Sequence, residues 1–159
     1  MSDVTWQLLP MLAAVALVLI NGVFVAAEFA IVRVRRTRLA ELAGQGAEAT
    51  KRALLLVDYV SEYLAVTQIG ITAASLGVGW FGESAFARLF LLVLPADRFS
   101  GTMIHVAAAV LAFLLITMMH VVVGELVPKN LGIRRPEHLL LVLVRPLQIL
   151  QQQRCWILG

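Results

Sequence analysis

The sequence contains little charge and almost no cysteine. Only 14% of its 159 residues are charged, whereas 60% are hydrophobic, and the mean hydropathy is +0.88. A soluble domain of this length needs more polar surface, so the composition indicates lipid as the solvent for part of the structure. The single cysteine, Cys155, has no partner for a disulfide within the chain. Cysteine content therefore gives no evidence about the redox compartment.

Common enzyme motifs are missing as well. The sequence has no glycine-rich phosphate loop, no paired cysteines and no histidine–glutamate motif of the metalloprotease type. Its basic residues are not interleaved with the aromatic residues that would suggest nucleic acid. We therefore expect neither an enzyme nor a nucleic-acid-binding protein.

Three apolar stretches are long enough to cross a bilayer, at about residues 6–32, 63–94 and 103–127. The first is roughly 40 Å long as a helix, which exceeds a hydrocarbon core of about 30 Å. It is too long for a typical signal peptide, and Asp3 rather than a basic residue precedes it, so a transmembrane helix is favoured. In the second stretch, glycines between residues 77 and 82 predict a broken helix.

Two further segments are too short or too charged to span. Residues 34–58 follow the start of an arginine cluster and predict two amphipathic helices at the cytoplasmic membrane surface, with a solvated helical hairpin as the alternative. Residues 137–153 contain Pro146 after a short apolar run, which predicts a kinked interfacial helix. The whole of 1–159 is thus predicted to be a single all-α membrane domain, with three transmembrane helices plus juxtamembrane interfacial helices.

Basic residues are unevenly distributed around the three spans. One side holds Arg33, Arg35, Arg36, Arg38, Lys51, Arg52, Lys129, Arg134, Arg135 and Arg145. The opposite side keeps essentially Arg98, with Arg88 nearby. The positive-inside rule then places the N-terminus outside and the C-terminus in the cytoplasm of a multi-pass protein of the plasma (inner) membrane.

Each span carries polar residues at helical spacing. These are Asn21 and Glu28 in the first span, Gln68, Thr72 and Ser75 in the second, and Thr117, His120 and Glu125 in the third. Polar groups at membrane depth usually face protein or water, so three such stripes can converge on one pocket. The alternative is hydrogen bonding between helices as a structural contact. For Glu28 a salt bridge with a nearby arginine is favoured over a ligand role, and for His120 a hydrogen-bonded core position is favoured over a ligand role.

The segment from Gly124 to Lys129 gives the strongest local argument. Pro128 has no backbone N–H, so the carbonyl of Gly124 loses its usual donor in a continuous helix. A free carbonyl beside the Glu125 carboxylate, in a kinked helix at membrane depth, is tolerated where it lines a water-filled cavity. With side-chain oxygens from other helices, this set suits a hard cation such as Mg²⁺. The alternative is a proline near a helix end beside a glutamate that reaches the membrane surface.

These residues carry a resemblance to a known family. The stretch Asn21-Gly-Val-Phe-Val-Ala-Ala-Glu-Phe-Ala, the stretch Thr67-Gln-Ile-Gly-Ile-Thr and the stretch Gly124-Glu-Leu-Val-Pro-Lys occur in order. Together they resemble the three helix motifs of the CorC and cyclin-M magnesium transporter family, over about residues 6–150. Many relatives have serine where this chain has Val25 and Ala27, or asparagine where it has Ile71 or Ser75.

The resemblance implies a homodimer that exports Mg²⁺, with Na⁺ entry proposed as the driving force. It also implies a cytosolic nucleotide-binding regulatory domain after the membrane domain. In the family, side chains from all three helices hold Mg²⁺, including the glutamate that matches Glu125, with a backbone carbonyl beside it. From this and the polar stripes we predict a metal site made of Glu125, Gly124, Asn21, Ser75, Thr72 and Gln68.

Two functional hypotheses follow. The first is a membrane domain that transports divalent cations, Mg²⁺ above all, by alternating access without ATP hydrolysis of its own. The second is a scaffold or regulator that does not transport but anchors a cytosolic sensor, its polar stripes being packing contacts. For the dimer we expect contacts from the second and third spans, around Ala73, Gly77 and Phe113.

Overall fold

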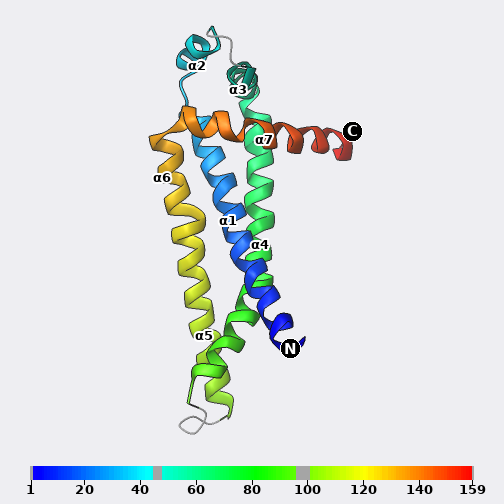
Figure 1. The fold of residues 1–159 in the computed structure, drawn as a ribbon, viewed down its shortest axis with the longest axis vertical. Coiled ribbons are helices and arrows are strands. Elements are labelled where there is room, and N and C mark those ends of the chain that lie inside the picture. Colours follow the sequence, from blue (N-terminus) through cyan, green and yellow to red (C-terminus); the bar gives the residue numbers. More distant parts are fainter. Residues whose placement is uncertain (1, 45–47, 96–100, 159) are drawn as a thin grey trace.

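The computed structural model describes residues 2–44, 48–95 and 101–158, and the side chains between residues 8 and 151 of these ranges. Every element in these ranges is a helix (Figure 1). The elements are α1 (Ser2–Arg33), α2 (Arg36–Ala43), α3 (Glu48–Asp58), α4 (Val60–Val93), α5 (Gly101–Met119), the π-helix η1 (His120–Leu126), α6 (Val127–Arg134) and α7 (Pro136–Leu158). The predicted all-α fold class is confirmed.

Three helical segments are long and apolar enough to cross a membrane: Leu8–Arg33, Val60–Val93 and Gly101–Arg134. The third is a single rod made of α5, η1 and α6, and it extends further than the predicted 103–127. It continues past Pro128, which stands in the first turn of α6, because the rod widens into η1 immediately before this residue. Figure 1 shows α1 between α4 and this rod, and α1 packs against α4, η1 and α6.

Glycines allow α1 to approach its neighbours closely. A Cβ atom on Gly132 of α6 would lie 2.8 Å from the carbonyl oxygen of Ala26 and 3.2 Å from the backbone nitrogen of Ala30. A Cβ atom on Gly22 of α1 would lie 2.9 Å from the ring of Pro128. Such small-residue contacts are a common way for helices to associate in lipid.

The predicted break in the second span is wrong, because α4 is one helix from Val60 to Val93. A Cβ atom on Gly77 would lie 2.7 Å from Leu17, and one on Gly82 would lie 2.8 Å from Ile116. These glycines therefore permit close packing of α4 against α1 and α5, and α4 changes direction in its second half without losing its helical form (Figure 1). Gly77 packs against Leu17 of α1 within the chain, and its expected contact with a second copy stays a prediction.

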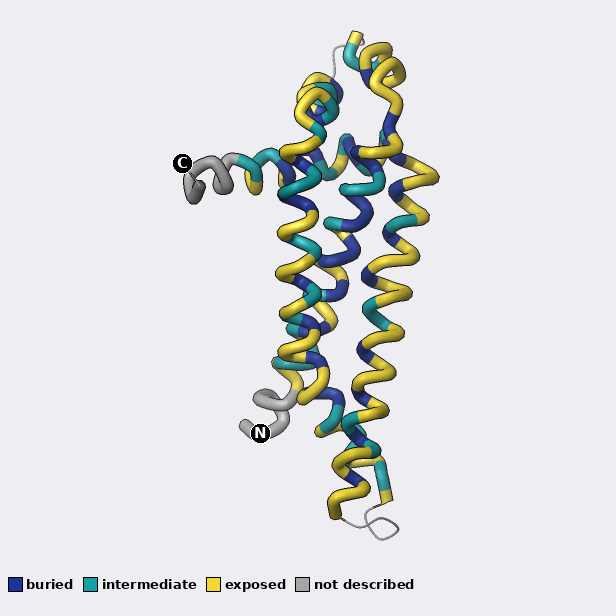
Figure 2. Tube along the Cα trace, turned by 180° about the vertical axis from the view of Figure 1, so that it is seen from behind, coloured by how far each residue is buried: buried dark blue, intermediate teal, exposed yellow. Residues whose placement is uncertain are grey.

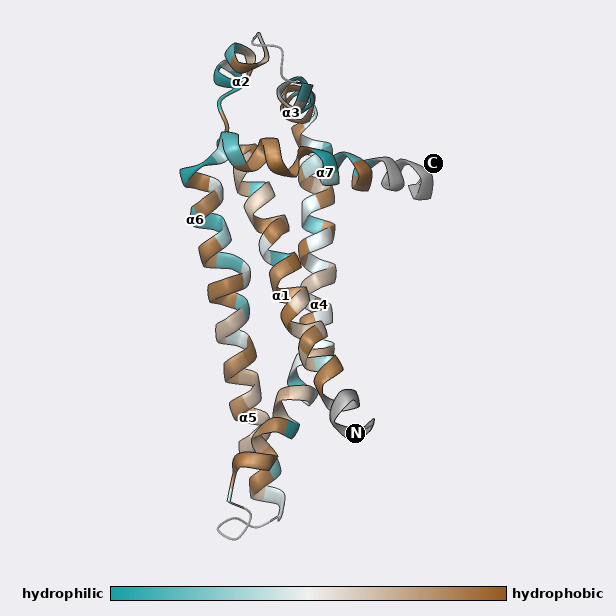
Figure 3. Ribbon diagram, in the orientation of Figure 1, coloured by the Kyte–Doolittle hydropathy of each residue, from teal (hydrophilic) through white to brown (hydrophobic). Residues whose placement is uncertain are grey.

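The two short helices α2 and α3 lie at one end of the long helices, and α7 lies across the long helices at the same end (Figure 1). Leu39 of α2, Leu56 of α3 and Leu140 of α7 are fully buried in one apolar cluster there. An ion pair of 2.8 Å between Arg36 and Asp58 joins the start of α2 to the end of α3. Hydrophilic residues are concentrated at this end (Figure 3).

Large apolar side chains cover the outside of the long helices. Leu76 and Trp80 of α4 are 71% and 82% exposed, and Phe113 of α5 is 57% exposed. Figure 2 shows exposed residues along the outer faces of all three long segments. An apolar surface of this extent is unfavourable in water and favourable against lipid.

The interfacial helix predicted at residues 137–153 corresponds to α7, which is longer than predicted and continues through Pro146. The basic residue expected on the opposite side, Arg98, lies outside the described residues.

Candidate functional site

The rod of α5, η1 and α6 widens into the π-helix η1 immediately before Pro128. In a π-helix each N–H bonds to the carbonyl five residues earlier, and the N–H of Val127 bonds accordingly to the carbonyl of Val122. Pro128 offers no N–H to the carbonyl of Gly124, so the regular α pattern cannot be completed here. Single π-helical turns of this kind are frequent at functional sites.

The carbonyl of Gly124 is paired with a side chain from α1. The side-chain amide of Asn21 donates a hydrogen bond of 3.0 Å from Nδ2 to the carbonyl oxygen of Gly124. Asn21 is 1% exposed, and a Cβ atom on Gly124 would lie 3.3 Å from its Nδ2. Glycine at position 124 thus keeps the space in which the Asn21 amide sits. The free carbonyl predicted from the sequence is instead satisfied by Asn21.

Ser75 of α4 extends this contact to a third helix. Its hydroxyl donates to Oδ1 of Asn21 over 3.4 Å, and its Oγ lies 3.4 Å from Nε2 of His120. A hydroxyl has one proton. When it goes to Asn21, Nε2 of His120 must carry a proton to donate to Ser75. The Nδ1 atom of His120 is buried and has no hydrogen-bond partner among the described residues.

Asn21, Ser75, His120 and the Gly124 carbonyl therefore form a polar junction that joins all three long segments, with Asn21 and Gly124 buried and Ser75 and His120 half-buried. Three of its four members belong to the predicted metal set. His120 does not, although its place in the third polar stripe was a usable signal for it.

The other predicted ligands lie outside the polar junction. Gln68 and Thr72 are exposed on α4, and the Thr72 hydroxyl donates over 2.8 Å to the carbonyl of Gln68 in its own helix. Glu125 is exposed, and it makes no hydrogen bond or ion pair with any residue that the structure describes. Glu125 points away because consecutive side chains along a helix point in different directions and Gly124 faces α1.

Carboxylates are scarce at this depth. Glu28 is half-buried, and no arginine in the described ranges lies within ion-pair distance of it, so its expected salt bridge is not formed. No group of three or more histidine, cysteine, aspartate or glutamate side chains that could hold a metal occurs among the described residues. The polar junction consists of an amide, a hydroxyl, an imidazole and a backbone carbonyl, and none of these groups is a carboxylate.

The fold and the polar junction define an all-helical membrane domain in which three membrane-length segments bring oxygen and nitrogen atoms together beside a π-helix. Over residues 12–152 the chain matches the family described as the cyclin M transmembrane N-terminal domain, and it belongs to that family. The resemblance carried by the three sequence motifs is confirmed.

Relatives in bacteria support the same assignment. The chain is 41% identical over 136 residues to UPF0053 protein YhdT of Bacillus subtilis (strain 168), covering 84% of this chain and 29% of that protein. It is 38% identical over 131 residues to UPF0053 protein YrkA of the same organism, covering 82% and 30%. It is 31% identical over 133 residues to the polyamine export protein of Haemophilus influenzae, covering 84% and 31%. The chain spans about a third of the length of the curated relatives it matches.

Proposed function

We propose that this chain is the membrane domain of a cation exporter and that Mg²⁺ is its cargo. The observation that carries the proposal is the polar junction, where Asn21, Ser75 and the Gly124 carbonyl bring oxygen atoms from three helices together. Oxygen donors suit Mg²⁺, which binds at about 2.1 Å and requires near-octahedral geometry. Family membership and the export function named for one relative are consistent with transport.

Cation binding requires a change in the polar junction. Because Nδ2 of Asn21 donates to the Gly124 oxygen, a hydrogen atom lies between the Asn21 amide and the Gly124 carbonyl, where a cation would bind. Rotation of the amide by about 180° exchanges Nδ2 for Oδ1, so two oxygens then face the same space. Glu125 supplies the charge that neutral oxygens lack if the rod turns during transport. In this proposal, one amide orientation belongs to the resting state and the other to the state that holds the cation. Transport requires no ATP hydrolysis by this chain, and Na⁺ is the proposed coupling ion.

A polyamine is the second candidate cargo, because one relative is named as a polyamine export protein. A polyamine carries several ammonium groups spread along an extended chain, whereas the polar junction gathers its oxygen atoms from three helices at one point. This compact arrangement favours a single small cation such as Mg²⁺ over a polyamine at this position.

We also propose that two copies pair. Gln68 and Glu125 are exposed in the single chain although they lie within membrane-length helices. Polar groups at this depth are costly against lipid, and a second copy that covers them removes that cost. Mass measurement in detergent should give a dimer at micromolar protein, and a monomer alone would contradict the pairing. In the whole protein, the resemblance adds bilayer lipid and a cytosolic nucleotide-binding regulatory domain as partners.

The orientation is part of the same proposal. The end with α2, α3 and α7 carries the arginine cluster, so it is proposed to face the cytoplasm, with the N-terminus outside the plasma (inner) membrane. Single cysteines at positions 3 and 38, in a background without Cys155, should react from the outside and the inside respectively. The reverse pattern would contradict the orientation.

A flux assay with paired variants tests the transport proposal. The full-length protein in liposomes with an enclosed Mg²⁺ indicator should move Mg²⁺. Ser75→Ala should reduce the flux about tenfold or more because it removes a hydroxyl of the polar junction. Thr72→Val is the matched control, since the Thr72 hydroxyl bonds only within α4 among the described residues. Equal flux in both variants would contradict the site.

Two further outcomes separate the competing functions. Flux of spermidine but not of Mg²⁺ would identify a polyamine exporter instead. If the folded protein moves neither cation, and if Ser75→Ala does not differ from Thr72→Val, the result would favour the hypothesis of a scaffold that does not transport.

A further inference from the structure

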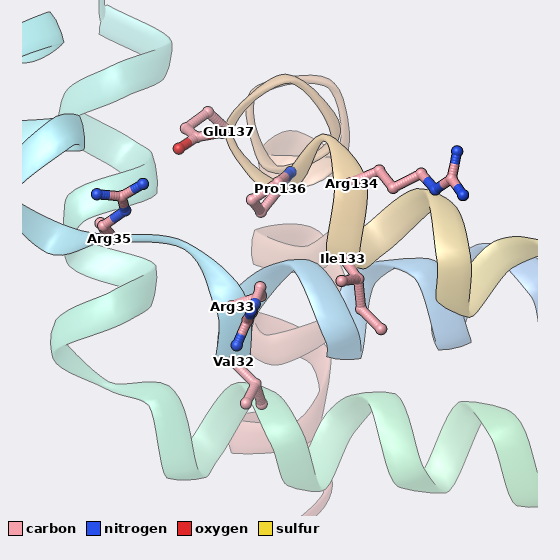
Figure 4. Close-up of a pocket in the computed structure, with 7 residues that line it drawn as sticks. All are labelled: Val32, Arg33, Arg35, Ile133, Arg134, Pro136 and Glu137. Atoms are coloured by element: carbon pink, nitrogen blue, oxygen red, sulfur yellow. The ribbon is translucent and has the colours of Figure 1, made fainter.

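A basic cavity lies at the end of the molecule that carries the short helices. It has a volume of about 590 Å³ and is lined by Val32, Arg33, Arg35, Ile133, Arg134, Pro136 and Glu137. Its walls are the end of α1, the link to α2, the end of α6 and the first turn of α7 (Figure 4). The volume is within the range of about 300–1,000 Å³ that is typical of small-molecule sites. The cavity is separate from the polar junction and shares no residue with it.

The four arginines at positions 33–38 divide into two kinds. Arg36 pairs with Asp58 at 2.8 Å and Arg38 pairs with Glu41 at 2.9 Å. Arg33 and Arg35 line the cavity, and neither has a carboxylate within ion-pair distance among the described residues. The arginines whose charge is balanced are therefore those outside the cavity, and the arginines inside it are available to an anion.

One carboxylate shares the cavity. Figure 4 shows Glu137 and Arg35 directed into the same gap from opposite walls, while the Arg134 side chain extends away from it along the outer side. Three arginines and one glutamate leave the lining with a formal charge of +2 (three positive charges minus one). A planar guanidinium group binds phosphate oxygens in two parallel hydrogen bonds, which makes arginine the usual residue for such an anion.

The position and the apolar part of the lining indicate where the phosphate comes from. Two of the three membrane-length segments, Leu8–Arg33 and Gly101–Arg134, end at arginines of this cavity. Val32 and Ile133 precede those arginines and are 63% and 38% exposed. A phosphate that enters between the arginines at this level can remain attached to acyl chains that lie against the apolar side chains.

We propose that this cavity binds a phosphate group, and that the group is the headgroup of an anionic phospholipid. Arg33 and Arg35 hold the phosphate, Arg134 lies at the outer edge, and Val32 with Ile133 contacts the first part of the lipid chains. Glu137 opposes the anion and limits the affinity. Occupancy would link the end of α1 to the start of α7 through the lipid, whatever the cargo of the polar junction is.

Native mass spectrometry of the detergent-solubilised full-length protein tests the proposal. Wild type should retain dioleoylphosphatidylglycerol in preference to dioleoylphosphatidylcholine. Arg33→Gln and Arg35→Gln should each lower retention of the anionic lipid about fivefold. Glu137→Gln should raise it by a similar factor, and this gain cannot result from misfolding.

Arg52→Gln is the matched control. Arg52 is exposed on α3 at the same end of the molecule and does not line the cavity, but its substitution removes the same charge. An equal loss of anionic lipid in Arg52→Gln would overturn the proposal, because the attraction would then be a diffuse property of the basic surface. A lack of gain in Glu137→Gln would also overturn it.

A second experiment distinguishes the two sources of phosphate. Inorganic phosphate is titrated calorimetrically into lipid-depleted protein in a neutral detergent. Weak binding of free phosphate, with strong arginine-dependent retention of phosphatidylglycerol, supports the lipid headgroup. Arginine-dependent binding of inorganic phosphate without retention of phosphatidylglycerol would overturn the lipid assignment and identify a soluble phosphate as the ligand.

Discussion

The Asn21 side chain donates to the backbone carbonyl of Gly124, a residue 103 positions further along the chain, over 3.0 Å. This bond joins α1 to the π-helix of the third rod, and it supplies the donor that Pro128 cannot. The atoms that stabilise the packing of two membrane helices are thus the same atoms proposed to bind the cargo. Substitutions in the polar junction are expected to affect both stability and transport. The two effects can be separated by comparing residues that contribute to packing with Glu125, which is exposed.

Replacement of Asn21 should destabilise the helix packing. Asn21→Leu keeps a side chain of comparable size but leaves the buried Gly124 carbonyl without its donor, at a cost of about 1–2 kcal/mol. Thermal unfolding in detergent should show the loss as a lower Tm. Thr72→Val is the control and should leave the Tm almost unchanged, since Thr72 is exposed. Equal Tm values for wild type and Asn21→Leu would mean that the bond contributes nothing.

The close contact between α1 and α6 should depend on Gly132. Gly132→Ala places a methyl group 2.8 Å from the Ala26 carbonyl oxygen, and because the neighbours are backbone atoms the helices must separate. We expect a loss of about 1–3 kcal/mol in unfolding free energy. Gly79→Ala provides the comparison, because a Cβ atom there meets nothing within 4 Å. That variant should be neutral or slightly stabilising, as alanine is the better helix former. The same Tm for both variants would exclude close packing at Gly132.

Glu125 should matter for transport and not for stability. Its side chain is exposed and has no ion-pair or hydrogen-bond partner in the described part of the chain, so Glu125→Gln removes no stabilising contact within one copy. Mg²⁺ flux in liposomes should be abolished, because the neutral oxygens of the polar junction cannot balance a divalent charge alone. The Tm and the size-exclusion profile should stay as in wild type. Normal Mg²⁺ flux from the folded variant would remove Glu125 from the mechanism.

The position of α2 against α3 should depend on pH. The hydrogen bond from Arg36 lowers the pKa of Asp58 below its ordinary value of 3.8; desolvation opposes this shift, and the positive charge of Arg36 adds to it. A lowered pKa in the folded state means that the ion pair stabilises this position fully above pH 3.8, and that its contribution is lost as the pH falls through the lower folded value.

Hydrogen exchange measures this effect directly. The protection of α2 amides, corrected for intrinsic exchange rates, should decrease below about pH 4 in wild type. Asp58→Asn should show the lower protection at every pH. Protection that falls equally with pH in wild type and in Asp58→Asn would assign the change to other carboxylates.

The sequence alone determined the features that depend on local properties. Length and hydropathy define the three membrane-length segments, because crossing a bilayer depends on the run of residues itself. Short motifs in the first, second and third spans indicated the family, and the match over residues 12–152 confirms it. Pro128 indicated a disturbed helix at Gly124, since the missing N–H belongs to the residue and not to its surroundings.

Only the tertiary structure decided which polar residues meet. Spacing placed Gln68, Thr72 and Ser75 on one stripe, but the rotation of α4 about its axis is set by contacts such as Gly77 on Leu17. That rotation turns Ser75 toward Asn21 and leaves the other two exposed. The π-helix likewise directs the Gly124 carbonyl to α1 and Glu125 to the outside. Helix rotation and hydrogen-bond register come from packing between distant segments, which periodicity within one segment does not contain.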